Sequence, residues 1–526
     1  MLRTWAAVAV ATIFIFVPGN SFAQNAGTTI RANSRLIIVD VVATDKNEQP
    51  ITDLRAEDFS VFEDGKPQDV NSFELHVAKS GGRVNRFALP ANQYTNASQV
   101  PDGPINILLV DAMNSSFLNQ EVSRKAVIHL LTTLPPGQPM AIFVLGDRLR
   151  MIQGFITDST LLRKAALEYK AETTLAQNRN AATESTREVI TRMQAQGAWV
   201  AGFQKVIEME HTDLVRDRVT ETMNAFKQLA RAVLGYPGRK NLVWLSGSFP
   251  LNLRLKYSAY AVEDFERQVH EVTNLLAASK IAVYPVDIRG MDSRASLLSS
   301  DLMTLRVFAE DTGGRAFYNS NDIESAMSRS LELGSTYYTL SYTPRNSKWN
   351  GNFREIKVEV KRNDTKLFYR RGYYAVDSIV ASKSKNLERD FQLAMIAESP
   401  ESTGIIVRAR VVDRKTDGTT IVEFALAGDQ LRLRDAQGTP FAAKYGFGVM
   451  AWDNQGKISG MGSEVWNLPG DPAIVAKIEQ EGWTHRLAVK IPESATHLRV
   501  AVQDQSVVNI GTVDVPLTAT SSFGGE

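Results

Sequence analysis

One feature constrains the fold of this chain more than any other. From residue 105 onward, apolar runs of strand length alternate with segments whose apolar residues recur at helical spacing. The apolar runs are 105–110, 140–145, 241–245 and 281–286, and helical faces lie between them, as at 127–134, 219–233 and 262–276. Strands that are apolar on both faces are covered on both sides, as in parallel sheets. The alternation therefore predicts a doubly wound, mostly parallel α/β sheet over residues 104–335.

One segment inside this region breaks the alternation. Residues 171–217 are polar, helix-favouring and long, and they have no strand of their own. We interpret this segment as a helical insertion at the rim of the sheet. It is either a surface decoration or an arm that binds a partner.

β-rich segments flank the α/β region. Residues 34–78 predict a small β module that is too short to bury a core alone, and residues 336–378 predict a further set of strands. We expect these two halves to pair, with the α/β region inserted between them. Residues 79–103 are polar and rich in Gly, Asn and Pro, which indicates a linker. Regular short strands over residues 385–520 predict a C-terminal β-sandwich.

The N-terminus has the pattern of an export signal. Arg3 precedes an apolar run over 5–17, and Ser21-Phe22-Ala23 offers small residues for cleavage, so residues 1–23 predict a signal peptide. No later stretch is long and apolar enough to predict a transmembrane segment. We expect an exported protein, in the periplasm or outside the cell.

Composition excludes several classes of function. The 526 residues carry a formal net charge of +1 and contain no cysteine. The charge balance gives no general attraction to nucleic acid, and the lack of cysteine excludes disulfides, thiolate metal sites and a cysteine nucleophile.

Three polar residues follow three of the predicted parallel strands. Asp111, Ser246 and Asp287 each come directly after an apolar run. In open α/β sheets, ligands bind outside the carboxyl ends of the strands. These residues are therefore the candidates for a binding site, with Asn114 and Ser115 in the loop after Asp111.

The stretch Asp111-Ala112-Met113-Asn114-Ser115-Ser116 resembles the metal-ion-dependent adhesion site of von Willebrand factor A (VWA) domains, which have a Rossmann-like sheet. The resemblance implies Mg²⁺ held by an Asp-x-Ser-x-Ser loop, a threonine and a second aspartate. This sequence has Met113 in place of the first serine and Ser246 in place of the second aspartate. Asp111 and Ser115 would remain as metal ligands of a degenerate site. One carboxylate is a poor Mg²⁺ site, so we predict no cofactor and keep bound Mg²⁺ as the alternative.

A wider resemblance covers roughly residues 34 to 376. It rests on LIIVDVVATD at 36–45, FEDGK at 62–66, the Asp111 loop, YPVDIRG at 284–290, DTGG at 311–314 and RGYY at 371–374. In this order the motifs are similar to the exported VWFA-related proteins known chiefly from Acidobacteria. The resemblance implies architecture and location more than an activity.

These observations favour an adhesion-like binding protein rather than an enzyme. We expect it to bind a protein or an envelope ligand through Asp111, Asn114, Ser115, Ser246 and Asp287. One alternative is an envelope assembly factor that acts through the 171–217 arm. Another is a hydrolase that uses Asp111 and Asp287 as a carboxylate pair, although no nucleophile or metal cluster accompanies them.

Overall fold

The computed structural model describes residues 36–77, 89–97, 100, 103–134, 137–195, 201–247, 259–290, 305–375, 387–396, 399–435, 438–506 and 509–517. The segment 1–23, predicted to be a signal peptide, lies outside the described residues. Within these ranges, no helix combines the length and the apolar character that crossing a bilayer requires.

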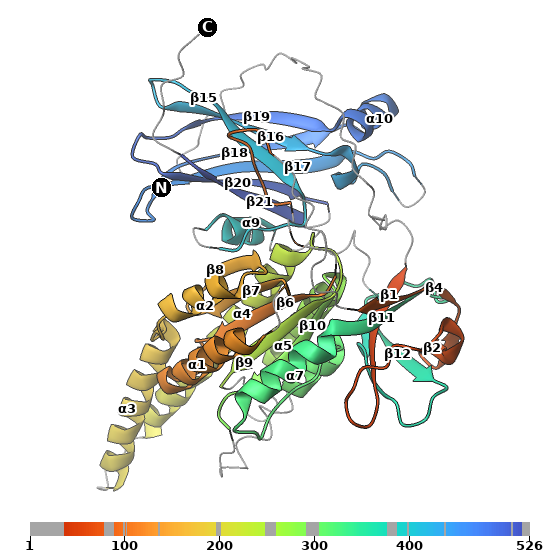
Figure 1. Ribbon diagram of the computed structural model, residues 1–526. Coiled ribbons are helices and arrows are strands. Elements are labelled where there is room, and N and C mark those ends of the chain that lie inside the picture. The colour runs from red at the N-terminus through yellow and green to blue at the C-terminus, as the bar shows by residue number, and fades with distance from the viewer. Residues whose placement is uncertain are drawn as a thin grey trace.

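A five-stranded mixed sheet forms the centre of the molecule (Figure 1). Its strand order is β10-β9-β6-β7-β8, and β10, β9, β6 and β7 run parallel to one another. The strands are β6 (Ile105–Asp111), β7 (Met140–Leu145), β8 (Leu149–Ile156), β9 (Lys240–Ser246) and β10 (Ile281–Asp287). Strand β8 is antiparallel to β7, because a turn of only three residues joins them and leaves no room for a crossover.

Helices cover both faces of the mixed sheet. One face packs against α1 (Phe117–Thr133), α2 (Ser159–Glu168) and α7 (Ile323–Ser335). The other face packs against α4 (Ala201–Val233), α5 (Ala259–Ala278) and the helix at 305–312. Alternate residues of each strand enter the two cores: Leu108 and Val243 belong to the first, and Leu109 and Trp244 to the second.

The prediction of a doubly wound, mostly parallel α/β fold is wrong for this chain. The described part contains five sheets, and four of them are antiparallel; only the central one is mixed. Most of the strands therefore lie in small antiparallel sheets. The alternation of strands and helices is a property of the middle of the sequence, and strands with one solvent-facing side dominate its two ends.

The N-terminal sandwich consists of two four-stranded sheets, β13-β1-β11-β4 and β14-β12-β2-β3, which share one core. Its strands come from both sides of the mixed sheet in sequence. They are β1 (Ile37–Thr44), β2 (Phe59–Glu63), β3 (Lys66–Gln68), β4 (Val70–Val77), β11 (Thr336–Tyr342), β12 (Phe353–Val360), β13 (Lys366–Phe368) and β14 (Gly372–Tyr374). Strand β1 pairs with β11 and β13, and β2 pairs with β12. The α/β unit is thus inserted into this sandwich.

A buried ionic cluster ties the two sheets of the N-terminal sandwich together. Glu63 and Arg354, each with a side chain 2% exposed, form an ion pair of 3.1 Å. The hydroxyls of Tyr342 and Tyr373 donate to the Glu63 carboxylate at 2.8 and 2.9 Å. Since Tyr342 belongs to one sheet and Glu63 to the other, the cluster spans the core, where removal of one charge would leave its partner uncompensated.

The C-terminal sandwich also encloses one core between two four-stranded sheets, β19-β16-β15-β5 and β18-β17-β20-β21. Its strands are β5 (Tyr94–Thr95), β15 (Val407–Arg414), β16 (Thr419–Leu426), β17 (Ala443–Trp452), β18 (Ile458–Leu468), β19 (Trp483–Lys490), β20 (His497–Asp504) and β21 (Asn509–Pro516). Two short helices accompany them, α9 (Leu387–Met395) and α10 (Pro472–Glu481).

Part of the segment 79–103, expected to be a linker, belongs to this sandwich. Strand β5 pairs with β15. The buried Asn96 donates to the carbonyls of Ser402 and Ile405 at 2.7 and 2.8 Å and accepts from the Val407 amide at 2.9 Å. The linker prediction fails here because a two-residue strand leaves no periodicity to detect.

Helix α3 (Leu175–Ala195) packs along α4 and projects away from both sandwiches (Figure 1). We call α3 and the part of α4 up to Asp217 the arm. The predicted boundary at residue 217 falls inside a helix, since α4 runs without a break from the arm into the face that covers the mixed sheet. The second half of the arm is therefore continuous with a core helix.

Candidate functional site

The three strand-end residues lie side by side at one edge of the mixed sheet. Strands β6, β9 and β10 are neighbours, and Ser246 and Asp287 are paired in the parallel register. The Ser246 hydroxyl donates to the Asp111 carboxylate at 2.8 Å. The structure thus brings Asp111 and Ser246 into direct contact.

Asp287 takes no part in this contact. Its carboxylate accepts from the Arg289 guanidinium at 2.9 and 2.8 Å and from the Arg289 amide at 3.0 Å. Strand β9 separates it from Asp111, which places the two strands roughly 10 Å apart. The carboxylate pair that a hydrolase would need is not formed.

Five hydrogen bonds saturate the buried Asp111 carboxylate. Oδ1 accepts from the Asn114 amide N–H at 2.9 Å and from Asn114 Nδ2 at 3.1 Å. Oδ2 accepts from Asn114 Nδ2 at 2.9 Å, Trp244 Nε1 at 3.0 Å and the Ser246 hydroxyl. Burial raises the pKa of Asp111 above its usual value, and these hydrogen bonds act in the opposite direction.

Helix α4 adds residues that the sequence did not identify. Asn114 Nδ2 also donates to the Thr222 hydroxyl at 2.9 Å, and the Arg218 guanidinium donates to Asn114 Oδ1 at 3.0 Å. Asp111, Trp244 and Ser246 point to the face of the sheet that α4 covers. Arg218 and Thr222, one helical turn apart on α4, therefore reach the loop that follows Asp111. The contact between Trp244 and Asp111 could have been expected from the sequence, because a buried indole N–H needs a hydrogen-bond acceptor.

The loop after Asp111 is also clamped from the side of α3. Gln177 Nε2 donates to the carbonyls of Ala112 and Ser115 at 2.6 and 2.5 Å. The Ser115 hydroxyl accepts from the Gly247 amide at 2.9 Å, and the Ser116 side chain caps α1. Neither Asp111 nor Ser115 caps α1; instead, both fasten the loop to its surroundings.

These residues do not fit the Mg²⁺ site that the resemblance implies. Both Asp111 oxygens face N–H and O–H donors of the chain, whereas a cation needs their lone pairs. Position 113 is a buried methionine, and the Arg218 guanidinium beside Asn114 brings a positive charge toward the place a cation would take. Among the described residues, no group of three or more His, Cys, Asp or Glu side chains could hold a metal ion.

The five predicted binding residues are all inaccessible to a large partner. Asp111, Ser246 and Ser115 are 0%, 1% and 3% exposed, and Asn114 and Asp287 are each 4% exposed. Exposed apolar side chains lie around them instead. Phe117 and Leu118, in the first turn of α1, are 57% and 73% exposed, and Leu175, at the start of α3, is 68% exposed.

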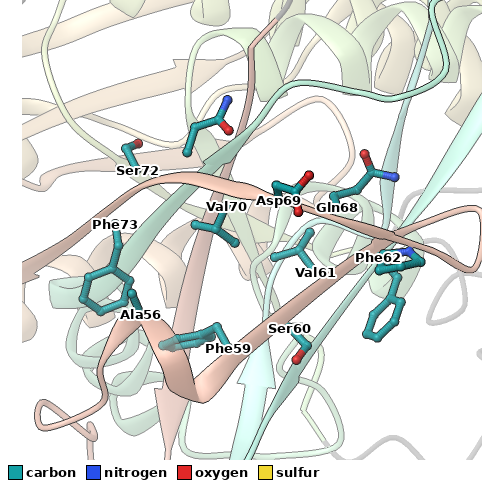
Figure 2. A pocket seen from close by; sticks show the side chains of 12 residues that line it. Ala56, Phe59, Ser60, Val61, Phe62, Gln68, Asp69, Val70, Ser72 and Phe73 are labelled. Carbon is teal, nitrogen blue, oxygen red and sulfur yellow. The ribbon is translucent and has the colours of Figure 1, made fainter.

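A groove of about 570 Å³ lies elsewhere, on the flank of the N-terminal sandwich between β2 and β4 (Figure 2). Phe59 and Phe73, with ring centroids 5.8 Å apart, are among its lining residues, and so are the polar residues Ser60, Asp69 and Ser72. None of the predicted site residues lines this groove. It is separate from the strand-end cluster, the name used below for the hydrogen-bonded group Asp111, Asn114, Arg218, Thr222, Trp244 and Ser246.

No protein-family model matches the chain, and no curated protein matches it. Several solved structures are similar to it. An aerotolerance-related membrane protein from Bacteroides fragilis is 10% identical, with 44% of this chain and 98% of that chain covered and a TM-score of 0.23. The BatB protein of Bacteroides thetaiotaomicron is 12% identical, with 44% and 97% covered and a TM-score of 0.23.

A third similar structure is a von Willebrand factor type A protein from Catenulispora acidiphila. It is 9% identical, with 61% of this chain and 75% of that chain covered and a TM-score of 0.24. The TM-scores of these neighbours are too low to establish a common fold with this chain. The narrower resemblance to the Acidobacteria family stays a prediction from sequence motifs.

Proposed function

We propose that this chain is a binding protein whose recognition surface is the arm, rather than the strand-end residues themselves. One observation carries the proposal. The strand-end cluster is buried beneath the base of the arm, while every described side chain of α3 from 178 to 192 is exposed. A partner would therefore meet the arm before it could meet Asp111. Binding rather than catalysis fits a carboxylate whose oxygens are already occupied.

The proposed setting is the bacterial envelope or the space outside the cell. The export pattern of residues 1–23 supports this setting. The partner is a protein or an envelope polymer. In this role the arm would act as a contact element for assembly or adhesion.

Photo-crosslinking in the producing cells tests the proposal. A photoreactive amino acid at Val189, 51% exposed on α3, should give a discrete crosslinked product. The matched control is Met461, 65% exposed on β18 of the C-terminal sandwich, which should give none. A product at Met461 without one at Val189, or no product at either position, would contradict the assignment of the arm.

A second crosslinking position distinguishes binding by the arm from binding by the rim, which is the surface formed by the first turn of α1. The exposed apolar residues of the first turn of α1 favour a rim contact as the other candidate surface, and Leu118 represents it. A crosslink at Leu118 alone would move the recognition surface to the carboxyl-end rim, as the sequence predicts. Crosslinks at both positions would indicate one continuous surface.

A further inference from the structure

The strand-end cluster joins the mixed sheet to both helices of the arm. Asn114 is its centre, because its side-chain amide donates to the Asp111 carboxylate and to Thr222, while its carbonyl oxygen accepts from Arg218. On the other side, Gln177 of α3 holds two carbonyls of the same loop. Five hydrogen bonds thus link the loop at 112–116 to the two helices of the arm.

The chain supplies at this site what a cation would otherwise supply. A buried carboxylate needs either an opposite charge or several hydrogen-bond donors. Here Asn114, Trp244 and Ser246 provide the donors. The guanidinium of Arg218 lies one side chain further out and is partly buried. The positive charge nearest to this site therefore belongs to α4, the helix that continues into the arm.

We propose that Asp111, Asn114 and Arg218 form a metal-independent latch that fixes the orientation of the arm on the mixed sheet. Asp111 anchors Asn114, and Asn114 holds Arg218 and Thr222 of α4. Gln177 fixes the first turn of α3 in the same frame. The latch concerns the orientation of the arm in the isolated protein, so this inference does not depend on which partner the arm binds. If a divalent cation held the arm instead, removal of the cation would change the orientation of the arm.

Spin-label distance measurements on the purified chain test the latch. The chain contains no cysteine, so two introduced cysteines can be labelled without background. Val189→Cys on α3 and Leu167→Cys on α2, 51% and 54% exposed, report the position of the arm against the body. The latch predicts a narrow distance distribution that is the same in EDTA and in Mg²⁺.

Variants of the latch should widen or shift that distribution. Asn114→Asp replaces the donating amide by a second carboxylate beside Asp111. Arg218→Met removes the Arg218 guanidinium and its charge while keeping an unbranched side chain about as long as the aliphatic part of arginine. The matched control is Arg216→Met, since Arg216 pairs only with Asp213 on the same helix among the contacts described, at 62% exposure. This control should keep the distribution of the unmodified chain.

Two results would overturn the latch. One is a distribution that changes in EDTA, which would show that a cation holds the arm. The other is an unchanged distribution in Arg218→Met and Asn114→Asp. If Asn114→Asp does not fold, Thr222→Val takes its place, because it removes only one hydroxyl from the cluster. The measurement needs no partner, so its failure and the failure of the crosslinking experiment are separate outcomes.

Discussion

Asp111 brings a carboxylate into a core that offers it only neutral donors. Such a group is stable there because each of its oxygens accepts at least two hydrogen bonds. Removal of a single donor leaves part of the charge unsolvated in a place that water does not reach. The contribution of each donor can therefore be measured by deleting it.

Ser246→Ala removes one of the three donors to Asp111 Oδ2. We expect the free energy of unfolding to fall by about 1–3 kcal/mol. Ser246→Asp should cost more, since it places a second carboxyl group in contact with Asp111. Urea denaturation measures both changes, and Ser463→Ala, at an exposed position of β18, is the control with a change below about 0.5 kcal/mol. Equal stability of Ser246→Ala and the unmodified chain would show that this hydrogen bond adds nothing.

The sequence predicted that Asp111 and Ser246 lie close together at the edge of the sheet, but it did not predict the residues that α4 adds to the site. Asp111 and Ser246 could be grouped because parallel strands end at one edge. Thr222 and Arg218 could not, because they lie on a helix whose register against the sheet depends on packing across the whole core. Met113 and Ser246 were the sequence features that argued against a cation site, and the structure shows donors of the chain at both oxygens of the Asp111 carboxylate.

Helix α7 shows how closely an element can approach the mixed sheet. Gly334, near its end, lies against the buried side chain of Asn241 on β9. A methyl group at this position would come within 2.1 Å of Asn241 Cγ, so it cannot be accommodated without movement. Asn241 in turn donates to Asn106 of β6 at 3.1 Å. Helix, strand and neighbouring strand are therefore held in one register.

Gly334→Ala should destabilise the α/β unit by about 1–3 kcal/mol, as expected for overpacking of a filled core. Thermal unfolding followed by circular dichroism gives the shift in melting temperature. Gly154→Ala on β8 is the matched control, because a methyl group there meets only the Met151 side chain at 3.7 Å, an ordinary contact. If both variants melt together with the unmodified chain, the close approach of α7 to β9 is not a constraint.

The elements that the sequence predicted best have continuous apolar runs or clear helical faces, such as β6, β9 and β10. Strand β18 was missed because glycine and serine interrupt its pattern, and as an edge strand it buries only one of its 11 residues. Helix α4 was divided in two because its polar outer half and its apolar inner half look like different segments. Length and packing, rather than local propensity, make it one helix.

The whole molecule is held together by contacts between its modules as well as within them. Thr403, in the segment that enters the C-terminal sandwich, donates to the Ala232 carbonyl at 2.7 Å and accepts from the Gly235 amide at 2.9 Å. Arg231 pairs with Asp390 at 2.7 Å, with side chains 12% and 13% exposed. The end of α4 therefore joins the C-terminal sandwich, as its beginning forms the arm.

Glu401 makes this junction sensitive to pH. Burial, together with the nearby Asp514, raises the pKa of its carboxyl to about 7 from an ordinary value of 4.5. The folded chain keeps this proton up to about pH 7, whereas the unfolded chain loses it near 4.5. The stability it contributes is therefore fully present below the unfolded value and is lost as the pH rises through about 7.

Glu401→Gln should remove this part of the pH dependence. The amide stays neutral, so above about pH 7 the variant should be more stable than the unmodified chain by about 1–2 kcal/mol, with the difference shrinking in acid. Urea denaturation across about pH 5 to 8 measures it. Glu481→Gln, at an exposed position at the end of α10, controls for the loss of one charge. Parallel pH profiles for Glu401→Gln and the unmodified chain would contradict the argument.

At the scale of the chain, the error in fold class has one physical source. The strand and helix alternation around β6 is the strongest local signal, and it decided the predicted fold class although β modules were predicted on both sides of it. Antiparallel sandwiches give weaker signals per residue, because only alternate side chains are apolar. How much of the chain belongs to antiparallel sandwiches can be recognised only when it is known which distant segments pair with each other.

The insertion of the α/β unit also means that the strands of the N-terminal sandwich are synthesised in two groups, far apart in time. Val39 of β1 faces Leu340 of β11, and the two are 340 − 39 = 301 positions apart. The first four strands therefore leave the ribosome long before the strands that complete their sheets, and their apolar sides stay uncovered in the meantime. We therefore expect the nascent chain to be prone to aggregation through these strands until their partner strands have been made.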